Sequence, residues 1–345
     1  MFSRITQLAR HLSRPQPNYV HFSAAASRPL RTAAPMTSSL HTALANSKRT
    51  IHTAACLIIG DEVLGGKTVD TNSAFFAKFC FSMGVLLKRV EVIADDESEI
   101  IEAVRRMSDK YDFVVTSGGI GPTHDDITYE SIAHAFNLPL KQHDEAFARM
   151  RRLSKPQQAQ HGFDWDTPSP ALTARLRMVQ IPTDPAIPLE RQALFVADDL
   201  WVPVSVVNGN IYILPGVPKL FERLCEGLKP WLLPRLVDGG AGKGQGIHRL
   251  LFATPLYEST IAPYLTELAK RVEGRGVKVG SYPRWGKKRN TVTLVGTDLE
   301  FMEGLVGEVE RNVEGRRVQR EDEDDPPEEE EGEGEMGEKG KVVEQ

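Results

Sequence analysis

Two short segments of this 345-residue sequence combine acidic side chains with glycines, and each follows an apolar run. The first segment contains Asp61, Asp70 and Asn72. The second reads Ser117-Gly-Gly-Ile-Gly-Pro-Thr-His-Asp-Asp126. Carboxylate and amide oxygens bind hard cations, whereas the backbone N–H groups of glycine-rich loops bind phosphate oxygens. Together the two segments predict metal-assisted chemistry on a phosphate group.

The glycines of the second segment predict a phosphate-binding loop. Gly118, Gly119 and Gly121 carry no side chain, so backbone N–H groups there can approach an anion closely. Thr123 adds a hydroxyl group. A helix expected to start near residue 127 directs the positive end of its dipole toward the same place. We therefore expect these four residues to bind the phosphates of a nucleotide.

Two acidic residues in this loop, Asp125 and Asp126, would repel a bound phosphate. The conflict disappears if a cation such as Mg²⁺ lies between the carboxylates and the phosphate. We expect Asp61, Asp125 and Asp126 to hold that cation and to carry the catalysis. The alternative is a turn that Asp126 closes by capping the next helix, without any ligand.

Apolar runs and helix signals predict a mainly parallel α/β sheet that positions both segments. The unbroken run at residues 53–59 suits a strand buried on both faces. Short connections between alternating strands and helices favour parallel pairing with helices on both faces. Strands are expected at 53–59, 85–94 and 113–116, and helices at 71–83, 96–110 and 127–136. Both chemical segments then follow the carboxyl ends of strands, where ligands bind in such sheets.

The charge of the chain, formally −5, is unevenly distributed. Residues 1–60 hold seven basic side chains and no acidic one, and residues 321–345 hold thirteen acidic side chains against two lysines. The basic, Arg- and Ser-rich start is typical of a mitochondrial transit peptide; a leader without an address is the alternative. Translation from Met36 would give a second, cytoplasmic product. The acidic end predicts a disordered tail.

Composition excludes several classes of protein. No apolar run approaches the ~18 residues that a membrane span needs, which argues against an integral membrane protein. The three cysteines are scattered, which argues against a disulfide framework or a structural zinc site. The excess of positive charge lies in residues 1–60, so the nearly neutral body gives no support for nucleic-acid binding.

Three longer motifs carry a resemblance to a known family. They are Gly60-Asp-Glu-Val-Leu-Gly-Gly with Asp70-Thr-Asn72, Gly118-Gly-Ile-Gly-Pro-Thr-His-Asp-Asp-Ile-Thr128, and Asn208-Gly-Asn-Ile-Tyr-Ile-Leu-Pro-Gly-Val-Pro218. They resemble the molybdopterin-binding (MoaB/Mog-type) domain family, in its CinA-like branch and in the N-terminal domain of eukaryotic FAD synthases. Asn208 and Gly209 would form the turn of a β-hairpin.

The resemblance implies a three-layer α/β fold with a small α/β second subdomain. It implies a molybdopterin-binding-like domain at 51–235 and a subdomain at 246–315, between the leader at residues 1–50 and the acidic tail at 321–345 that composition predicts. It also implies hydrolysis of the pyrophosphate bond of a dinucleotide such as FAD or ADP-ribose, with Mg²⁺, Mn²⁺ or Co²⁺. Its partners would be nucleotides or flavins, and a homo-oligomer is compatible with it.

The resemblance assigns further roles to single residues and leaves rival functions open. Asp70 and Asn72 would position the metal or a ribose. Tyr282 and Trp285 would stack on an aromatic ring, with a surface turn around a packed Trp285 as the alternative. The rival functions are molybdopterin adenylyl transfer and catalytically silent flavin or nucleotide binding. FMN adenylylation is not expected, because no FAD-synthesising domain follows residue 313.

Overall fold

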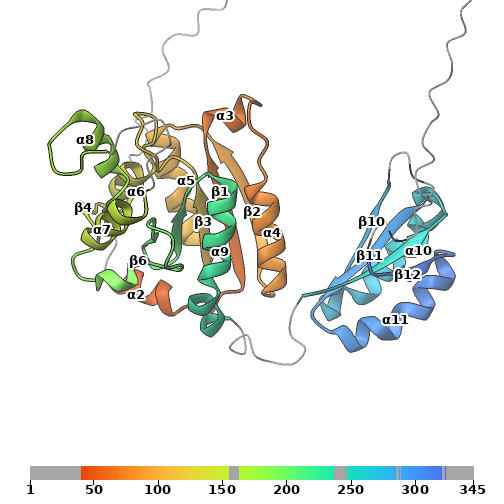
Figure 1. The fold of residues 1–345 in the computed structure, drawn as a ribbon. Helices are drawn as coiled ribbons and strands as arrows, with labels where there is room; N and C mark the ends of the chain where they lie inside the picture. Colours follow the sequence, from red (N-terminus) through yellow and green to blue (C-terminus); the bar gives the residue numbers. More distant parts are fainter. Residues whose placement is uncertain are drawn as a thin grey trace, which may run out of the picture. The chain divides into compact units, whose positions relative to one another are not determined.

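The computed structural model describes residues 40–154, 163–236, 247–284, 287, 289–320 and 323. The N-terminal domain, residues 40–236, is built on a six-stranded sheet with the order β2-β1-β3-β8-β7-β6 (Figure 1). Strands β2, β1, β3 and β8 are parallel, and β7 and β6 continue the sheet with antiparallel pairing. The strands are β1 (Thr53–Ile59), β2 (Leu86–Ile93), β3 (Phe113–Ser117), β6 (Ala193–Leu194), β7 (Val204–Val207) and β8 (Ile211–Leu214).

Helices cover both faces of this sheet and make three layers. α4 packs beside α9 on one face, and α5 packs beside α6 on the other (Figure 1). The mixed α/β architecture with a mainly parallel sheet is therefore confirmed. The helices are α2 (Leu40–Lys48), α3 (Asp61–Leu64), α4 (Asn72–Ser82), α5 (Glu97–Lys110), α6 (Thr128–Phe136), α7 (Asp144–Leu153), α8 (Pro170–Arg177) and α9 (Pro218–Leu232). The short pieces are β4 (Leu140–Gln142), β5 (Gln180–Pro182), η1 (Leu189–Arg191) and η2 (Leu233–Arg235).

Local signals in the sequence explain where these elements begin and end. β1 has the predicted bounds, and all but its first residue are buried. The Asp96 side chain accepts a hydrogen bond from the Glu99 backbone N–H at 3.0 Å, which caps α5. α6 ends at Asn137, and the β7–β8 turn lies at Asn208 and Gly209; all three have positive φ, the conformation that Asn and Gly tolerate best.

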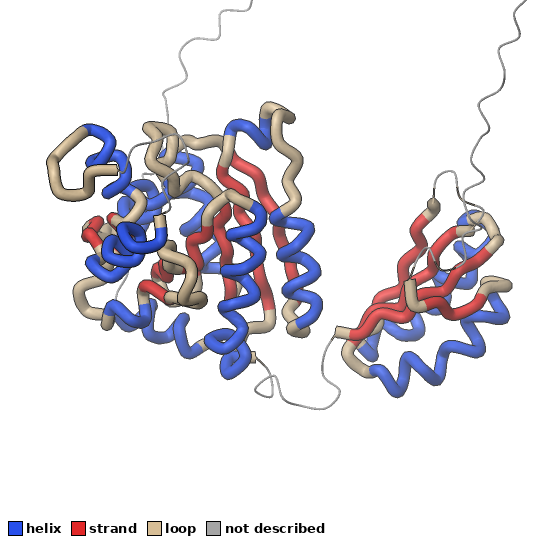
Figure 2. Tube along the Cα trace, viewed as in Figure 1, coloured by secondary structure: helices blue, strands red, loops and turns tan. Residues whose placement is uncertain are grey.

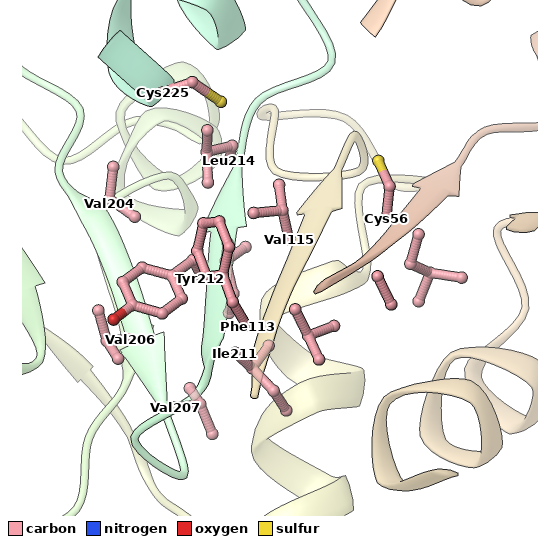
Figure 3. Close-up of a cluster of buried hydrophobic side chains, with 14 of the residues drawn as sticks. Cys56, Phe113, Val115, Val204, Val206, Val207, Ile211, Tyr212, Leu214 and Cys225 are labelled. Atoms are coloured by element: carbon pink, nitrogen blue, oxygen red, sulfur yellow. The ribbon is translucent and has the colours of Figure 1, made fainter. Parts of the chain in front are cut away.

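The core of the N-terminal domain lies between the sheet and its helices, and Figure 3 shows part of it. Phe113 and Tyr212 meet edge to face, with ring centroids 5.0 Å apart. Cys56, Cys80 and Cys225 are buried free thiols. Burial raises the pKa of Cys80 to about 12, so this thiol stays protonated and serves as packing.

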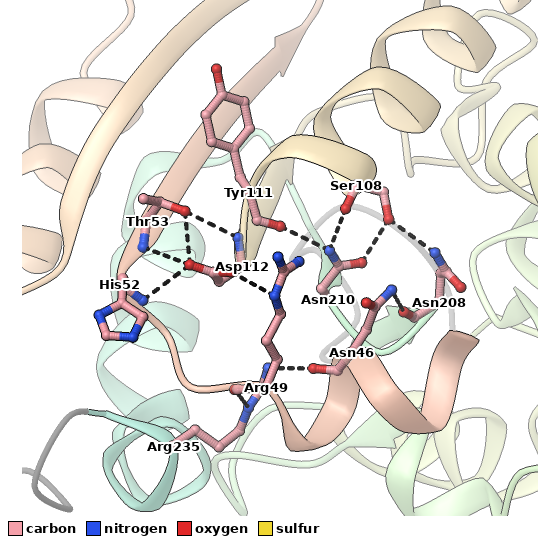
Figure 4. A network of polar contacts seen from close by, with 10 residues as sticks. All are labelled: Asn46, Arg49, His52, Thr53, Ser108, Tyr111, Asp112, Asn208, Asn210 and Arg235. Carbon is pink, nitrogen blue, oxygen red and sulfur yellow. Dashed lines mark hydrogen bonds and ion pairs between the residues drawn. The ribbon is translucent and has the colours of Figure 1, made fainter. Parts of the chain in front are cut away.

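A buried polar network closes the edge of the sheet at the amino ends of the parallel strands (Figure 4). Asp112 Oδ2 accepts hydrogen bonds from the backbone N–H groups of His52 and Thr53 and from the Thr53 hydroxyl, at 2.8–3.1 Å. Beside it, Asn210 Nδ2 donates to the carbonyl oxygens of Ser108 and Tyr111. These bonds join the start of β1 to the end of α5 and to the β7–β8 hairpin.

The ordered domain begins earlier than expected, because α2 belongs to it. Ala43 on this helix is 1% exposed, and the Asn46 side chain donates to the Asn208 carbonyl at 2.9 Å. Gly209 leaves room for α2, since a Cβ there would lie 2.2 Å from the Ala43 carbonyl oxygen. The predicted leader of residues 1–50 is therefore too long at its end, and residues 1–39 lie outside the described part. This helix was not predicted, because its amphipathic pattern is too weak to recognise in nine residues.

The C-terminal domain is a four-stranded antiparallel sheet with the order β10-β11-β9-β12 and two helices. Its chain order β-α-β-β-α-β is that of a ferredoxin-like unit. The elements are β9 (His248–Thr254), α10 (Glu258–Val272), η4 (Glu273–Arg275), β10 (Lys278–Tyr282), β11 (Asn290–Gly296), α11 (Leu299–Asn312) and β12 (Arg316–Val318). β12 forms an edge of the sheet, so this domain extends beyond the predicted boundary at residue 315.

The described helices include none that is long and apolar enough to cross a membrane. Apart from Glu323, the predicted acidic tail at residues 321–345 lies outside the described part of the chain.

Candidate functional site

The carboxyl ends of four parallel strands meet at one edge of the N-terminal sheet. Ile59 at the end of β1 lies opposite Ile93 at the end of β2. Ser117 at the end of β3 lies opposite Ile58 of β1 on one side and Leu214 of β8 on the other. The two chemical segments therefore start at the same level of the sheet, as predicted. The loops that follow β2 and β8 start there as well.

The loop after β3 is so tight that two of its positions require glycine. Gly118 has a φ of 113°, and a Cβ on it would lie 2.1 Å from the Ile59 carbonyl oxygen. Gly119 has a φ of 64°, and a Cβ on it would lie 2.2 Å from Thr128 Oγ1. Thr128, the first residue of α6, donates its N–H to the Gly119 carbonyl and its hydroxyl to the Gly118 carbonyl, both at 2.9 Å. The loop is thereby held against the start of α6.

Asp126 closes this loop from within. The Thr123 backbone N–H donates to Asp126 Oδ2 at 2.9 Å, and the Thr123 hydroxyl donates to the same oxygen. Gly121 makes room for this carboxylate, because a Cβ there would lie 2.5 Å from Asp126 Oδ2. Asp126 thus holds the loop in shape through Thr123, whereas the N-cap position of α6 is Ile127 and has no side-chain cap, so the helix cap of the alternative is not formed.

Asp125 is oriented differently from its neighbour, and its side chain is 62% exposed. The pKa of Asp125 is lowered by its proximity to the polar Thr123 side chain, which is the largest cause, by a backbone hydrogen bond and by the nearby charges of His124 and Arg177. Its carboxylate is therefore ionised at neutral pH and can meet a ligand.

Asp95 belongs to the same acidic group, although its residue type and spacing alone did not single it out. It follows the end of β2, and its Oδ2 accepts the Asp61 backbone N–H at 3.0 Å. Burial raises the pKa of Asp95, whereas the hydrogen bond from Asp61 lowers it. The charges of Asp61, Glu62 and Asp125 raise it further. A Cβ on Gly119 would lie 3.4 Å from Asp95 Oδ1, so this carboxylate lies beside the glycine loop. Its place after a parallel strand was the available signal.

Asn72 and Asp70 connect the first segment to the others in different ways. Asn72 is 6% exposed, and its Nδ2 donates to Ser117 Oγ at 2.9 Å and to the Gly216 carbonyl at 2.8 Å. Its Oδ1 is buried without a hydrogen-bond partner, so it can accept from a ligand. Asp70 instead accepts the Ser73 backbone N–H at 2.9 Å and the Ser73 hydroxyl, which stabilises the start of α4.

Arg177 at the end of α8 braces the glycine loop from the outside. Its guanidinium donates to the carbonyl oxygens of Thr123 and Asp126, the latter at 2.9 Å. It also contacts the Glu130 carboxylate on α6 at 3.2 Å. More than fifty residues separate Arg177 from the loop, so no local motif predicts the contact.

We expect Arg177→Met to loosen the loop without unfolding the domain. The methionine keeps much of the apolar side chain but removes both donors, each of which contributes about 1 kcal/mol. Amide hydrogen exchange at residues 117–128 should then accelerate by about tenfold or more. Arg175→Met is the matched control, since Arg175 lies on the same helix but stacks on Phe163 with 4.0 Å between guanidinium carbon and ring centroid. Equal exchange rates in both variants would contradict the bracing role.

The carboxylates predicted to hold a cation are not gathered into a ready ligand set. Within the described ranges, no three His, Cys, Asp or Glu side chains are placed so as to hold a metal ion. The negative charge of these residues nevertheless suits a cation. Asp61 and Asp125 lie close enough to Asp95 for their charges to raise its pKa. Asp126 suits it least, since its Oδ2 already accepts two hydrogen bonds.

Of the two predicted stacking residues, the structure describes Tyr282, which lies in the C-terminal domain. Tyr282 ends β10 and is 56% exposed. Trp285 lies outside the described residues.

Comparisons with known proteins identify both domains. Residues 55–234 match the profile of a family described as a probable molybdopterin-binding domain, and residues 247–322 match one described as the middle domain of FAD synthase. A probable FAD synthase of Caenorhabditis elegans is 36% identical over 74% of this chain and 48% of its own length. A protein of Pyrococcus horikoshii is 31% identical over 77% of this chain and 96% of its own length.

Two further relatives belong to the CinA-like branch. A CinA-like protein of Anaeromyxobacter dehalogenans is 28% identical over 78% of this chain and 61% of its own length. The crystal structure of a CinA protein from Thermoplasma acidophilum matches 54% of this chain and 99% of its own with 30% identity and a TM-score of 0.42. The chain spans about half the length of the FAD synthases that it matches. The chain thus belongs to the family of the probable molybdopterin-binding domain, with relatives among CinA-like proteins and FAD synthases.

Proposed function

We propose that this protein is a metal-dependent pyrophosphatase that hydrolyses a dinucleotide such as FAD or ADP-ribose. The family and the FAD-synthase relatives support a function related to nucleotides or cofactors. The observation that carries the finer proposal is the meeting of a bare glycine loop with the carboxylates of Asp61, Asp95 and Asp125 at one sheet edge. This combination suits a diphosphate and a cation at the same time.

In this proposal the glycine loop binds the diphosphate. Gly118 already donates its N–H to the Leu214 carbonyl at 3.2 Å, so the proposal depends on the rest of the loop, which leads directly into the nine-residue helix α6. The N-terminus of such a helix favours a negative charge. Asp126 and Arg177 keep the loop in this conformation and do not touch the reacting atoms themselves.

The acidic residues act next to the scissile bond. Asp61, Asp95 and Asp125 would hold a divalent cation, which supplies charge stabilisation for the phosphoryl oxygens when bound. The nucleophile is water: its oxygen bonds to one phosphorus, and the bridging P–O bond breaks to release two monophosphates. Asp125, whose carboxylate is ionised, accepts the proton that the water loses.

Asn72 supplies a contact for the sugar. Its buried Oδ1 accepts no hydrogen bond from the protein, whereas its Nδ2 is fixed by Ser117 and Gly216. An acceptor held in this way suits a ribose hydroxyl, which donates a hydrogen bond. Asn72 therefore positions the substrate in this proposal.

A second candidate is molybdopterin adenylyl transfer, which the description of the matched family favours. It would use the same loop to bind the phosphate of the pterin. The two functions differ in their products, since adenylyl transfer consumes ATP in the presence of molybdopterin.

The proposal is tested by incubating the full chain with FAD, ADP-ribose or NADH, each with Mg²⁺, Mn²⁺ or Co²⁺ and with EDTA as the control. We expect FMN and AMP from FAD, or AMP and ribose phosphate from ADP-ribose, only with a metal. No product with any metal would refute hydrolysis. In that case, adenylylated pterin formed from ATP and molybdopterin would favour the second candidate.

A further inference from the structure

Strand β2 forms one edge of the N-terminal sheet (Figure 2). Among the described strands it pairs only with β1. The Ile93 carbonyl at the end of β2 accepts the Gly60 N–H, so the backbone groups of Ile93 face β1. Because these groups alternate in direction along a strand, those of Val90 and Val92 point away from β1. The outer side of β2 therefore offers N–H and C=O groups with which another strand can pair.

Apolar side chains are exposed along the same strand. Leu86 is 42% exposed and Val90 is 43% exposed, although both are residue types that usually pack in a core. β2 is eight residues long, whereas β6 at the opposite edge of the sheet has two residues. A long edge strand with exposed apolar side chains is a template for pairing. Of the two edges of this sheet, β2 is thus the one suited to receive a further strand.

The charges on β2 suit a second copy of the same strand. The Arg89 side chain is 50% exposed, and it lies 3.7 Å from Glu91, too far for a hydrogen bond. If two copies of β2 pair antiparallel with their centre at Val90, Arg89 lies opposite the second copy's Glu91, and Glu91 lies opposite the second copy's Arg89. Opposite charges placed directly across an antiparallel pair are stabilising.

Other registers of the same pair are less favourable. A centre at Arg89 or at Glu91 would place that residue opposite its own copy, so that like charges face each other. A centre at Val92 would pair only the end of the strand. With the centre at Val90, the outward backbone groups of the two Val90 residues meet in a hydrogen-bonded pair. Lys88 then lies opposite the second copy's Val92, which its aliphatic stem can cover.

We propose that β2 is a dimer interface, at which a second copy of this chain pairs antiparallel across Val90 and continues the sheet. The ladder between β1 and β2 is irregular where Ala54 and Ala55 lie opposite Leu87 and Arg89. Such a bulge and the charges beside it disfavour pairing with unrelated strands. A second copy matches these charges. The proposal concerns the sheet edge and does not depend on hydrolysis at the candidate site.

A disulfide at the centre of the interface tests the register. The full chain with Val90→Cys is oxidised with diamide, and we expect a covalent dimer that a reductant dissociates. Across a hydrogen-bonded antiparallel pair the two Cα atoms lie about 5.5 Å apart, within the range of a disulfide. The three native cysteines are buried and should add little background. Leu86→Cys is the matched control, because Leu86 is similarly exposed on the same strand but would lie about 26 Å from its copy.

Sedimentation equilibrium of the full chain tests the dimer itself, at concentrations up to about 1 mM because small interfaces bind weakly. Val90→Lys places two lysines opposite each other and should raise the dissociation constant of the dimer by about tenfold or more. Arg89→Glu should raise it as well, because it places two acids opposite each other. Leu189→Lys is the control, since Leu189 is 51% exposed on η1, outside β2.

Three results would overturn the proposal. The first is a wild-type chain that stays monomeric over this range of concentration, which would mean that the outer side of β2 is bare or covered by another part of the same chain. The second is an equal yield of covalent dimer from Val90→Cys and Leu86→Cys. The third is a dimer that Val90→Lys leaves as stable as Leu189→Lys does, because the copies would then meet elsewhere.

Discussion

Asp125→Asn should lower the rate of FAD hydrolysis by about 100-fold or more at saturating metal. The substitution keeps the size of the side chain but removes the charge that attracts a cation and accepts a proton. Because the side chain is 62% exposed, the domain should fold as before. The measurement is the steady-state release of FMN over a range of metal concentrations.

Asp95→Asn should instead raise the metal concentration that gives half-maximal rate, by about tenfold or more.

Two comparison variants separate chemistry from folding. Asp126→Asn should mainly loosen the loop, because Asp126 accepts hydrogen bonds from Thr123 and does not face the ligand in this proposal. Asp109→Asn is the surface control, since Asp109 is an exposed acid near the far end of α5. If Asp125→Asn hydrolyses FAD at the rate of the Asp109 control, the assignment of Asp125 is wrong.

Asp112→Ala should lower the free energy of unfolding by about 3 kcal/mol. Asp112 is 7% exposed, and its loss removes the acceptor of the partly buried backbone N–H groups of His52 and Thr53. The ion pair with Arg49 at 3.0 Å adds little, since the Arg49 side chain is 48% exposed. Urea unfolding of the full chain measures the difference, and Asp109→Ala, on the helix α5 that precedes Asp112, is the control. A change under 1 kcal/mol would contradict the role of this network.

The contribution of Asp112 should also depend on pH. Burial alone would raise the pKa of this carboxyl, but hydrogen bonds from the Thr53 hydroxyl and from the His52 and Thr53 backbone, with the charge of Arg49, outweigh it and lower the pKa. A lowered folded-state pKa means that the stabilisation is present above the unfolded value of about 3.9. It is lost as the pH falls through the folded-state pKa. The difference between wild type and Asp112→Ala should therefore be constant near neutral pH and shrink below about pH 4.

Most elements of the N-terminal sheet were predictable because local physics decides them. The run at Thr53–Ile59 is apolar throughout, and Asp96 and Asn137 mark a helix start and a helix end by their own hydrogen bonds and backbone preference. β9, β12 and α2 were missed for the opposite reason. Their sequences carry no clear signal, and their pairing or packing partners lie far away in the chain.

The candidate site was likewise predictable only in part. The glycines and carboxylates of its two loops stand together in the sequence, and a parallel sheet must bring strand ends to one edge. The residue types could not show that Asp126 faces inward while Asp125 faces outward. In a loop the direction of each side chain depends on the local backbone conformation, which the residue types do not determine. Asp95 was not predicted as a site residue, because no glycine motif lies beside it in the sequence.

By itself the sequence determined the alternation of strands and helices, the glycine loop and the identity of the acids, since each depends on neighbours within a few residues. Only the tertiary structure decided which acids share a charge environment, that Arg177 braces the loop from more than fifty residues away, and that Tyr282 lies over Gly280. These relations depend on distances between separate segments of the chain, which packing of the whole domain sets and local sequence does not encode.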